Sequence, residues 1–261
     1  VNAIVISPDN RFLYFNSGSR TDHGEVQENA GTFPGLRETP LTAAVLRIPI
    51  DADSLRLPDD RDALVAGGYL YSDGLRNAFD LAFAANGDLF AAENGPSRDV
   101  PDELNWLRQG HHYGFPWRLG ATDNPTLLAG YNSADDPLLS FAFGNYAEDL
   151  GFPPPPVGVQ FTRGVANLGP DGDHRRRPID GVPEDASEMG DTLFTFTPHR
   201  SPLGLVFDVK DELGGEYRGD AFVLSLDGRR ELLRELGDPA EDLLHLEMHK
   251  ERDRYVMRSH Q

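Results

Sequence analysis

The neighbouring residues Arg76 and Asn77 stand just before a predicted strand that contains the apolar run 81–84. The guanidinium of arginine is a rigid fork of donors that suits a carboxylate or a polarised carbonyl, and the asparagine amide adds a donor and an acceptor. This pair therefore predicts a site for an anionic or carbonyl-bearing ligand. The structural alternative is that Arg76 only pairs with a nearby carboxylate such as Asp73 or Asp80.

A group of carboxylates lies between positions 93 and 123. Its members are Glu93, Asp99, Asp102, Glu103 and Asp123. A Gly-Pro turn at 95–96 stands among them, and its backbone carbonyls are free to point at a cation. Ca²⁺ accepts about six to eight oxygen ligands in flexible geometry, so an acidic loop of this kind suits calcium. The alternative is that these acids are solvated surface groups of a chain that is acidic throughout.

The composition excludes several classes of partner and site. The sequence has 261 residues, with 43 acidic and 24 basic side chains and a formal net charge of -19. This balance predicts no nucleic-acid or anionic-membrane partner, because both are polyanions. The sequence contains no cysteine, which excludes disulfides, thiolate metal ligands and a cysteine nucleophile. No segment approaches the roughly 20 consecutive apolar residues that a membrane-spanning helix needs.

Short apolar runs separated by polar turns predict the strands that position these residues. The runs are 3–7, 12–16, 43–50, 81–84, 89–92, 192–196, 203–208, 221–226, 243–248 and 255–258. The turns at 8–11 and 85–88 each join two successive runs and predict hairpins. Pro49 favours an edge position for the strand at 43–50. The 27 glycines and 20 prolines predict many turns and few long helices.

The spacing of these elements predicts an all-β fold. The two hairpins start roughly 75–80 residues apart, which favours a β-propeller with long insertions over a sandwich. The stretch from about 94 to 188 is expected to be largely irregular, and loops of that length are usually functional. No shift in composition marks a domain boundary, so residues 1–261 are expected to form a single domain.

Four motifs in one order resemble the soluble quinoprotein glucose dehydrogenases and aldose sugar dehydrogenases of the glucose/sorbosone dehydrogenase family. They are Gly-Leu-Arg-Asn at 74–77, Glu-Asn-Gly-Pro at 93–96, Asp-Glu-Leu-Asn at 102–105 and His-Tyr-Gly-Phe-Pro at 112–116. A weaker likeness extends to 4–9 and 45–48. The resemblance implies a six-bladed β-propeller or an incomplete portion of one, with long loops between the strands.

The resemblance also implies a cofactor, pyrroloquinoline quinone (PQQ), and oxidation of the C1 hydroxyl of an aldose to a lactone by hydride transfer to the quinone. Arg76 and Asn77 would contact the quinone carbonyls, where negative charge develops as the hydride arrives. The lysine and paired arginines that hold the PQQ carboxylates in the family have no clear counterparts. His199 and Arg200 are the candidates for part of that role.

Two calcium sites are implied by the same resemblance. The backbone carbonyls of Gly95 and Pro96 would bind the Ca²⁺ that bridges to PQQ. Glu103, Tyr113 and Asp123 match a second, structural calcium site by their spacing.

The histidine that serves the family as catalytic base would fall about two residues before Val1, outside this sequence. His23 is the candidate substitute, because an adjacent carboxylate such as Asp22 raises the basicity of an imidazole. The alternative is that residues 18–25 form an ordinary polar turn. The missing histidine and the start of the sequence inside an apolar run predict a partial chain.

Two other functions remain open from the residues. One is a calcium-dependent propeller lactonase or esterase, in which the metal polarises a lactone carbonyl without a quinone. The other is a non-catalytic propeller module that calcium stabilises. For the leading interpretation, the resemblance implies a sugar substrate, an external electron acceptor and a periplasmic or extracellular location.

Overall fold

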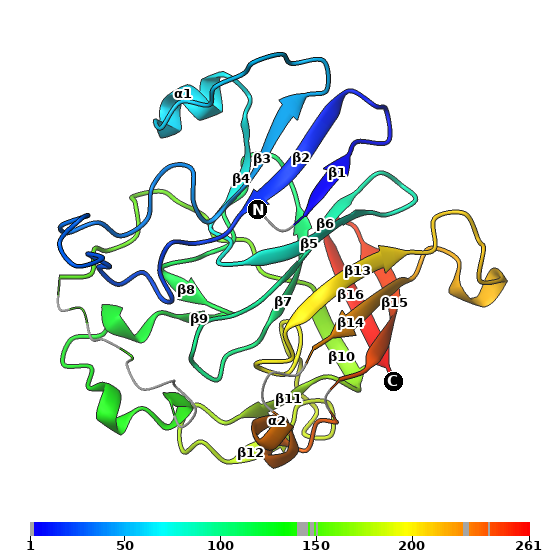
Figure 1. The fold of residues 1–261 in the computed structure, drawn as a ribbon. Coiled ribbons are helices and arrows are strands. Elements are labelled where there is room, and N and C mark those ends of the chain that lie inside the picture. Colours follow the sequence, from blue (N-terminus) through cyan, green and yellow to red (C-terminus); the bar gives the residue numbers. More distant parts are fainter. Residues whose placement is uncertain (1–2, 140–145, 147–148, 150, 227–229, 240) are drawn as a thin grey trace.

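The computed structural model describes residues 3–139, 146, 149, 151–226, 230–239 and 241–261, and three β-sheets form its framework (Figure 1). The first sheet is antiparallel with the order β1-β2-β3-β4. Its strands are β1 (Ile4–Ile6), β2 (Phe12–Ser17), β3 (Ala44–Pro49) and β4 (Leu70–Asp73). The predicted β1–β2 hairpin is confirmed, because Ile4 pairs with Phe15 and Ile6 with Leu13.

The predicted edge position of the strand that contains Pro49 is wrong. β3 lies inside the first sheet, between β2 and β4. Pro49 is the last residue of β3 and pairs with Phe12 at the end of the ladder. A proline at that place removes no hydrogen bond from the interior of the sheet, so an inner strand tolerates it.

The second sheet has the order β5-β6-β7 and carries most of the motif residues. Its strands are β5 (Ala78–Phe83), β6 (Leu89–Glu93) and β7 (Glu103–Leu107). The predicted β5–β6 hairpin is confirmed. Its turn is closed by the backbone N–H of Asp88, which donates to Asn86 Oδ1 at 3.0 Å, and by Gly87 at a φ of 85°. Glycine adopts this left-handed conformation without steric cost.

The third sheet has the order β10-β16-β15-β14-β13, with β10 parallel to β16 and the other pairs antiparallel. Its strands are β10 (Ala166–Pro170), β13 (Pro202–Phe207), β14 (Ala221–Ser225), β15 (Leu243–Glu251) and β16 (Arg254–His260). Four of these match predicted strands. The strand predicted at 192–196 is wrong, since that segment makes only isolated bridges, Asn167 to Leu193 and Asp102 to Phe196.

Shorter elements connect the sheets. They are the helices α1 (Arg61–Ala66) and α2 (Arg230–Leu236), the strand pairs β8 (Arg118–Leu119) with β9 (Thr122–Asp123) and β11 (His174–Arg176) with β12 (Pro183–Asp185), and single 3-10 turns at Pro125–Leu127, Ser133–Asp135, Pro137–Leu139 and Gly215–Tyr217. The stretch from 94 to 188 is therefore less irregular than expected, because β7 to β12 lie in it.

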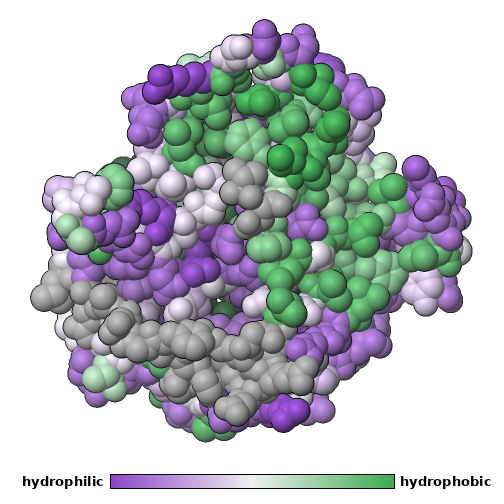
Figure 2. Space-filling model, viewed as in Figure 1, coloured by the Kyte–Doolittle hydropathy of each residue, from purple (hydrophilic) through white to green (hydrophobic). Residues whose placement is uncertain are grey.

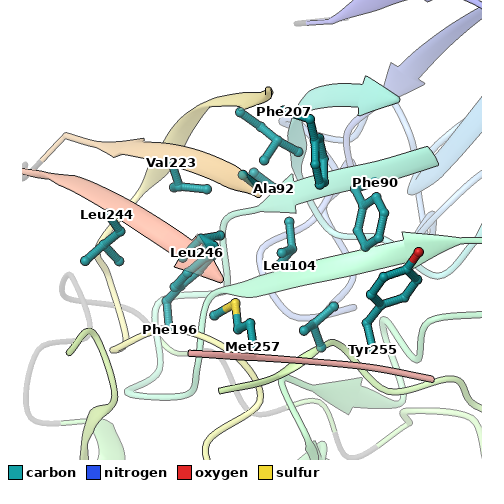
Figure 3. Close-up of a cluster of buried hydrophobic side chains, with 13 residues drawn as sticks. Phe90, Ala92, Leu104, Phe196, Phe207, Val223, Leu244, Leu246, Tyr255 and Met257 are labelled. Atoms are coloured by element: carbon teal, nitrogen blue, oxygen red, sulfur yellow. The ribbon is translucent and has the colours of Figure 1, made fainter. Parts of the chain in front are cut away.

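The second sheet lies between the other two, so its central strand is buried on both faces. Side chains alternate along a strand. Leu89 and Ala91 pack in a cluster with Tyr14 and Val45 of the first sheet. On the other face, β6 contributes to the cluster in Figure 3, which holds Phe90, Ala92, Leu104, Val165, Phe196, Leu205, Phe207, Ala221, Val223, Leu244, Leu246, Tyr255 and Met257.

The all-β prediction is confirmed. The three sheets follow chain order and contact one another through β2 with β5 and β13 with β5 and β6, as successive blades of an incomplete propeller would (Figure 1). Three sheets with three or more strands occur in the described part of the chain, rather than the six of a complete propeller. That residues 1–261 form one domain stays a prediction.

The outer sheets leave apolar side chains in contact with solvent. Figure 2 shows these green side chains over the first sheet and over β13 and β14. Among them, Ile4 and Ile6 of β1, Val206 of β13 and Leu224 of β14 are all at least half exposed. Among the described residues, no helix has the length and apolar character needed to cross a membrane.

The core predicts a large difference between two apolar substitutions. Phe90 is completely buried, so Phe90→Ala removes the contacts of an aromatic ring and is expected to cost about 3–5 kcal/mol of unfolding free energy. Val206, at 59% exposure, is the control, and Val206→Ala is expected to change stability by less than about 0.5 kcal/mol. Urea unfolding measures both, and equal midpoints for the two variants would contradict the described core.

Candidate functional site

Two glutamates face each other at the ends of neighbouring strands. Glu93 ends β6 and Glu103 begins β7, and the two are direct partners in the antiparallel register. Side chains of such partners lie on one face of the sheet with Cβ atoms about 4.5–5.5 Å apart. Both glutamates are buried. The register therefore places two carboxylates side by side and away from water.

A single asparagine lies between these carboxylates. Asn105 is fully buried, and its Nδ2 donates to Glu93 Oε2 at 2.8 Å and, more weakly, to Glu103 Oε2 at 3.4 Å. Glu93 also accepts a hydrogen bond from the backbone N–H of Arg76. Glu103 accepts only the weaker of the two Asn105 hydrogen bonds, so less of the cost of burying its carboxylate is compensated than for Glu93.

The pKa values of both glutamates reflect this placement. Burial raises the pKa of Glu93 to about 7, against the opposing effects of the Arg76 backbone N–H, the Arg76 charge and Asn105. Burial, together with the negative charge of Glu93, raises the pKa of Glu103 well above its usual range. Without a cation, the pair therefore holds protons at neutral pH that ordinary glutamates release. A divalent cation would replace those protons and stabilise both carboxylates.

A small cavity adjoins the two glutamates. Its volume is about 10 Å³, the space of a single water molecule or a bare metal ion. It is lined by Gly74, Arg76, Glu93, Gly95, Pro96, Pro101, Glu103, Tyr113, Phe115, Arg118, Leu119 and Gly120. Five residues predicted from the sequence, Arg76, Gly95, Pro96, Glu103 and Tyr113, thus come together around one cavity.

The turn that carries Gly95 and Pro96 is held by a buried carboxylate. Asp102 Oδ1 accepts a hydrogen bond from the Gly95 N–H at 2.6 Å, and Asp102 Oδ2 accepts one from Ser201 N at 2.8 Å. Tyr113 has its hydroxyl engaged, since it accepts from Arg108 N and donates to the Trp106 carbonyl. Its backbone carbonyl is thus the oxygen of Tyr113 that a cation can use.

Arg76 connects the cavity to a second, larger opening. Its Nη2 forms an ion pair with Asp22 Oδ1 at 2.6 Å, its Nε donates to the Asp22 carbonyl at 2.9 Å, and its Nη1 donates to the Asn94 carbonyl at 3.2 Å. The structural alternative for Arg76 is therefore wrong in its partners, because neither Asp73 nor Asp80 pairs with it. Asp73 instead pairs with Arg61.

The second opening is a cleft of about 390 Å³. Its lining residues are Gly18, Ser19, Arg20, Thr21, Asp22, Gln27, Arg76 and Asn77. Three of the five N–H donors of the Arg76 guanidinium are used as described, which leaves two without a partner among the described residues. The predicted pair Arg76 and Asn77 therefore lines a cleft large enough for a small organic ligand.

His23 lies near this cleft but outside its lining. It is only 2% exposed and stacks on Tyr146 with ring centroids 3.9 Å apart. Its Nδ1 is 3.2 Å from Glu25 Oε2 and 3.6 Å from Asp22 Oδ2. Burial acts to raise the pKa of Asp22, but His23 and Arg76 outweigh it and hold that pKa well below its ordinary range. Asp22 therefore lines the cleft, whereas His23 does not.

The remaining predicted residues lie elsewhere. His199 Nε2 is 3.0 Å from Asp99 Oδ1, and neither residue lines the cavity or the cleft. Arg200 is fully buried and pairs with Asp238 and Asp242, so its guanidinium is committed to internal carboxylates. Asp123 is exposed and pairs with Arg118 at 3.2 Å, and it does not line the cavity.

The sequence did not reveal the role of Asn105 or the pairing of Asp22 with Arg76. Asn105 follows Glu103 by two positions, and the period of two along a strand is the signal that places both on one face. Asp22 is 54 positions from its partner Arg76, and no local signal in the sequence points to that ion pair.

Comparisons with known proteins agree with the motifs. Residues 2–127 match the family model described as Glucose / Sorbosone dehydrogenase. Quinoprotein glucose dehydrogenase B of Acinetobacter calcoaceticus is 34% identical over 144 residues, which are 50% of this chain and 29% of that protein. The chain thus spans less than a third of the length of this curated relative.

Solved structures of sugar dehydrogenases are also similar. Soluble aldose sugar dehydrogenase from Escherichia coli, in its apo-form, matches with a TM-score of 0.44 and 16% identity, covering 97% of this chain and 52% of that one. The PQQ-bound form of aldose sugar dehydrogenase from Streptomyces coelicolor matches with a TM-score of 0.35 and 18% identity, covering 93% and 47%. Through the family match, the segment 2–127 of this chain belongs to the glucose/sorbosone dehydrogenase family.

Proposed function

We propose that this chain is part of a PQQ-dependent sugar dehydrogenase that oxidises the C1 hydroxyl of an aldose to a lactone. The observation that supports this most directly is the cavity that gathers Arg76, Gly95, Pro96, Glu103 and Tyr113 beside a buried carboxylate pair. The family resemblance implies Arg76 for the cofactor, Gly95 and Pro96 for the calcium that bridges to it, and Glu103 and Tyr113 for a second calcium. Because the ligands of both expected calcium sites line one cavity, we propose a single calcium there. The sugar, the external electron acceptor and a periplasmic or extracellular location belong to the same proposal.

The donor set fits calcium. Glu93 and Glu103 are buried acids with raised pKa values, which a cation would relieve, and the cavity has the volume of one ion. Carboxylate and carbonyl oxygens are the ligands that Ca²⁺ prefers. We assign Glu103 and the carbonyls of Gly95, Pro96 and Tyr113 to it. Asp123 is left out, because it is exposed and faces Arg118.

The cleft beside Arg76 fits the cofactor in size and polarity. When bound, PQQ supplies the oxidising power, because its quinone accepts the hydride from the sugar C1. Arg76 would orient the quinone with its two unused N–H donors, and Asn77 lines the same wall. Asp22 keeps the Arg76 guanidinium fixed, so its donors need no rearrangement when charge develops. Arg200 is not assigned to the cofactor, because two buried aspartates already hold it.

The candidate base His23 is buried outside the lining of the cleft, and Asp22, whose Oδ2 is 3.6 Å from His23 Nδ1, lines the cleft. The second candidate function is a calcium-stabilised module without turnover. It is favoured by this burial of His23 and by the commitment of Arg200 to internal ion pairs.

Titration with PQQ in the presence of Ca²⁺ tests the proposed enzyme. We expect an absorbance change on binding and reduction of an artificial dye when glucose is added. Arg76→Lys is expected to lower dye reduction at least about tenfold, because lysine lacks the planar fork that can serve Asp22 and a quinone together. Arg11→Gln, at an exposed ion pair with Asp9, is the control and should leave the rate unchanged. Binding without turnover would favour the module, and absence of binding would refute the cofactor assignment.

Removal of calcium is expected to destabilise the protein. A ligand present at about 100 times its Kd stabilises the native state by about 2.7 kcal/mol. At 2–4 °C per kcal/mol for a chain of this size, adding Ca²⁺ back to the chelator-treated protein should raise Tm by about 5–10 °C. Glu103→Gln should abolish this rise, whereas Asp123→Asn, the exposed acid nearby, should retain it. A rise that survives in Glu103→Gln would place calcium elsewhere.

The effect of calcium is expected to depend on pH. Without calcium, folded Glu93 keeps its proton up to a pKa of about 7, while the unfolded chain releases it near the usual value of 4.5. The folded state therefore binds more protons in that interval, and stability falls as pH rises through it. Thermal unfolding in EGTA should show this fall, and the gain from Ca²⁺ should be larger at about pH 8 than at about pH 5, because protons compete less. Glu93→Gln should reduce the decrease of stability with rising pH. An unchanged decrease in this variant would contradict the raised pKa of Glu93.

A further inference from the structure

A second group of potential metal ligands lies on the short β11–β12 ribbon. Its members are Asp173, His174 and Asp185, and each brings one ligand atom into a set whose atoms lie within 4.8 Å of one another. The register of the ribbon accounts for this, since His174 of β11 pairs directly with Asp185 of β12. None of the three lines the cavity or the cleft described above.

Two buried polar atoms of this group have no hydrogen-bond partner among the described residues. Asp173 is fully buried, and while its Oδ2 accepts from Ser187 N at 2.9 Å, its Oδ1 accepts nothing. His174 Nδ1 is also without a hydrogen bond. A buried polar atom left unpaired costs about 1–3 kcal/mol, and more when the group is charged. Such a carboxylate oxygen beside an imidazole calls for a cation.

The separation of the ligand atoms suits a shared ion better than a direct contact. His174 Nε2 and Asp185 Oδ2 are 3.7 Å apart, which is too long for a hydrogen bond. Zinc binds nitrogen and carboxylate oxygen at about 2.0–2.2 Å, so two ligands of one tetrahedral ion lie roughly 3.4 Å apart. A small closure of the two side chains would bring both onto one metal.

A buried carboxylate lies near the second nitrogen of the His174 ring. A ligating imidazole usually directs its second nitrogen toward a carboxylate, which fixes the ring. Here Nδ1 is 4.0 Å from Oδ2 of Asp238, which is beyond hydrogen-bond distance, and the buried Asp238 accepts from Thr197 and pairs with Arg200. Thr197 Oγ1 in turn accepts from the His174 backbone N–H at 3.0 Å.

We propose that Asp173, His174 and Asp185 bind a divalent transition metal of the zinc class. A mixed nitrogen and oxygen donor set favours such metals over calcium, which takes oxygen ligands. The ion would connect the β11–β12 ribbon to the segment that ends α2, because Gly237 lies against the His174 ring. Its role is structural, and it is separate from the proposed calcium cavity.

Zinc titration of the full chain tests this site. The protein is first stripped with EDTA and then titrated with Zn²⁺ in excess Ca²⁺, so that the glutamate cavity stays filled and failure of one site is distinguishable from failure of the other. We expect one Zn²⁺ per chain by calorimetry. His174→Gln and Asp185→Asn should each weaken it at least about tenfold, the range that changes around a metal ligand produce.

His249 offers a matched control. It is a half-exposed histidine whose Nε2 is 3.2 Å from Glu247 Oε1, so it represents an ordinary surface pair. His249→Gln should retain the wild-type zinc affinity. X-ray absorption of the zinc-bound protein should show one imidazole together with oxygen ligands. Unchanged zinc affinity in folded His174→Gln and Asp185→Asn, or no stoichiometric binding in the wild-type chain, would overturn the proposal.

Discussion

The antiparallel pairing of Glu93 with Glu103 is the constraint on which the site depends. It brings two carboxylates together out of water, where their charges repel and their hydration is lost. Asn105 and one backbone N–H compensate for only part of this cost. The pair therefore requires a proton or a cation. The nearby Gly-Pro turn, held by Asp102, lines the same small volume.

Local features of this chain were predictable from the sequence. The β1–β2 and β5–β6 hairpins follow from apolar runs with turn residues between them, because alternation and turn chemistry act over a few residues. The sequence predicted separate calcium sites for Glu103 and for the Gly-Pro turn, whereas both line one cavity. The prediction for Pro49 was wrong because a proline at the end of a strand does not indicate whether that strand has one neighbour or two.

Long-range ion pairs explain most of what the sequence did not reveal. Arg200 has the residue type of an anion ligand, yet its partners Asp238 and Asp242 come from a segment about 40 positions later. Asp99 likewise forms an ion pair with Arg176, which lies on the β11–β12 ribbon. In an acidic chain, every arginine has many candidate partners, and only the tertiary fold selects among them. Residue type alone thus overestimates how many charges face a ligand.

Arg76 belongs to two compartments at once, since it lines the small cavity and the larger cleft. Its backbone N–H donates to Glu93, while its guanidinium is fixed by Asp22. A change in the charge of Glu93 therefore acts on the residue that forms the wall of the cleft. A ligand in the cleft and a cation in the cavity would both contact this residue, and any coupling between them would be reciprocal.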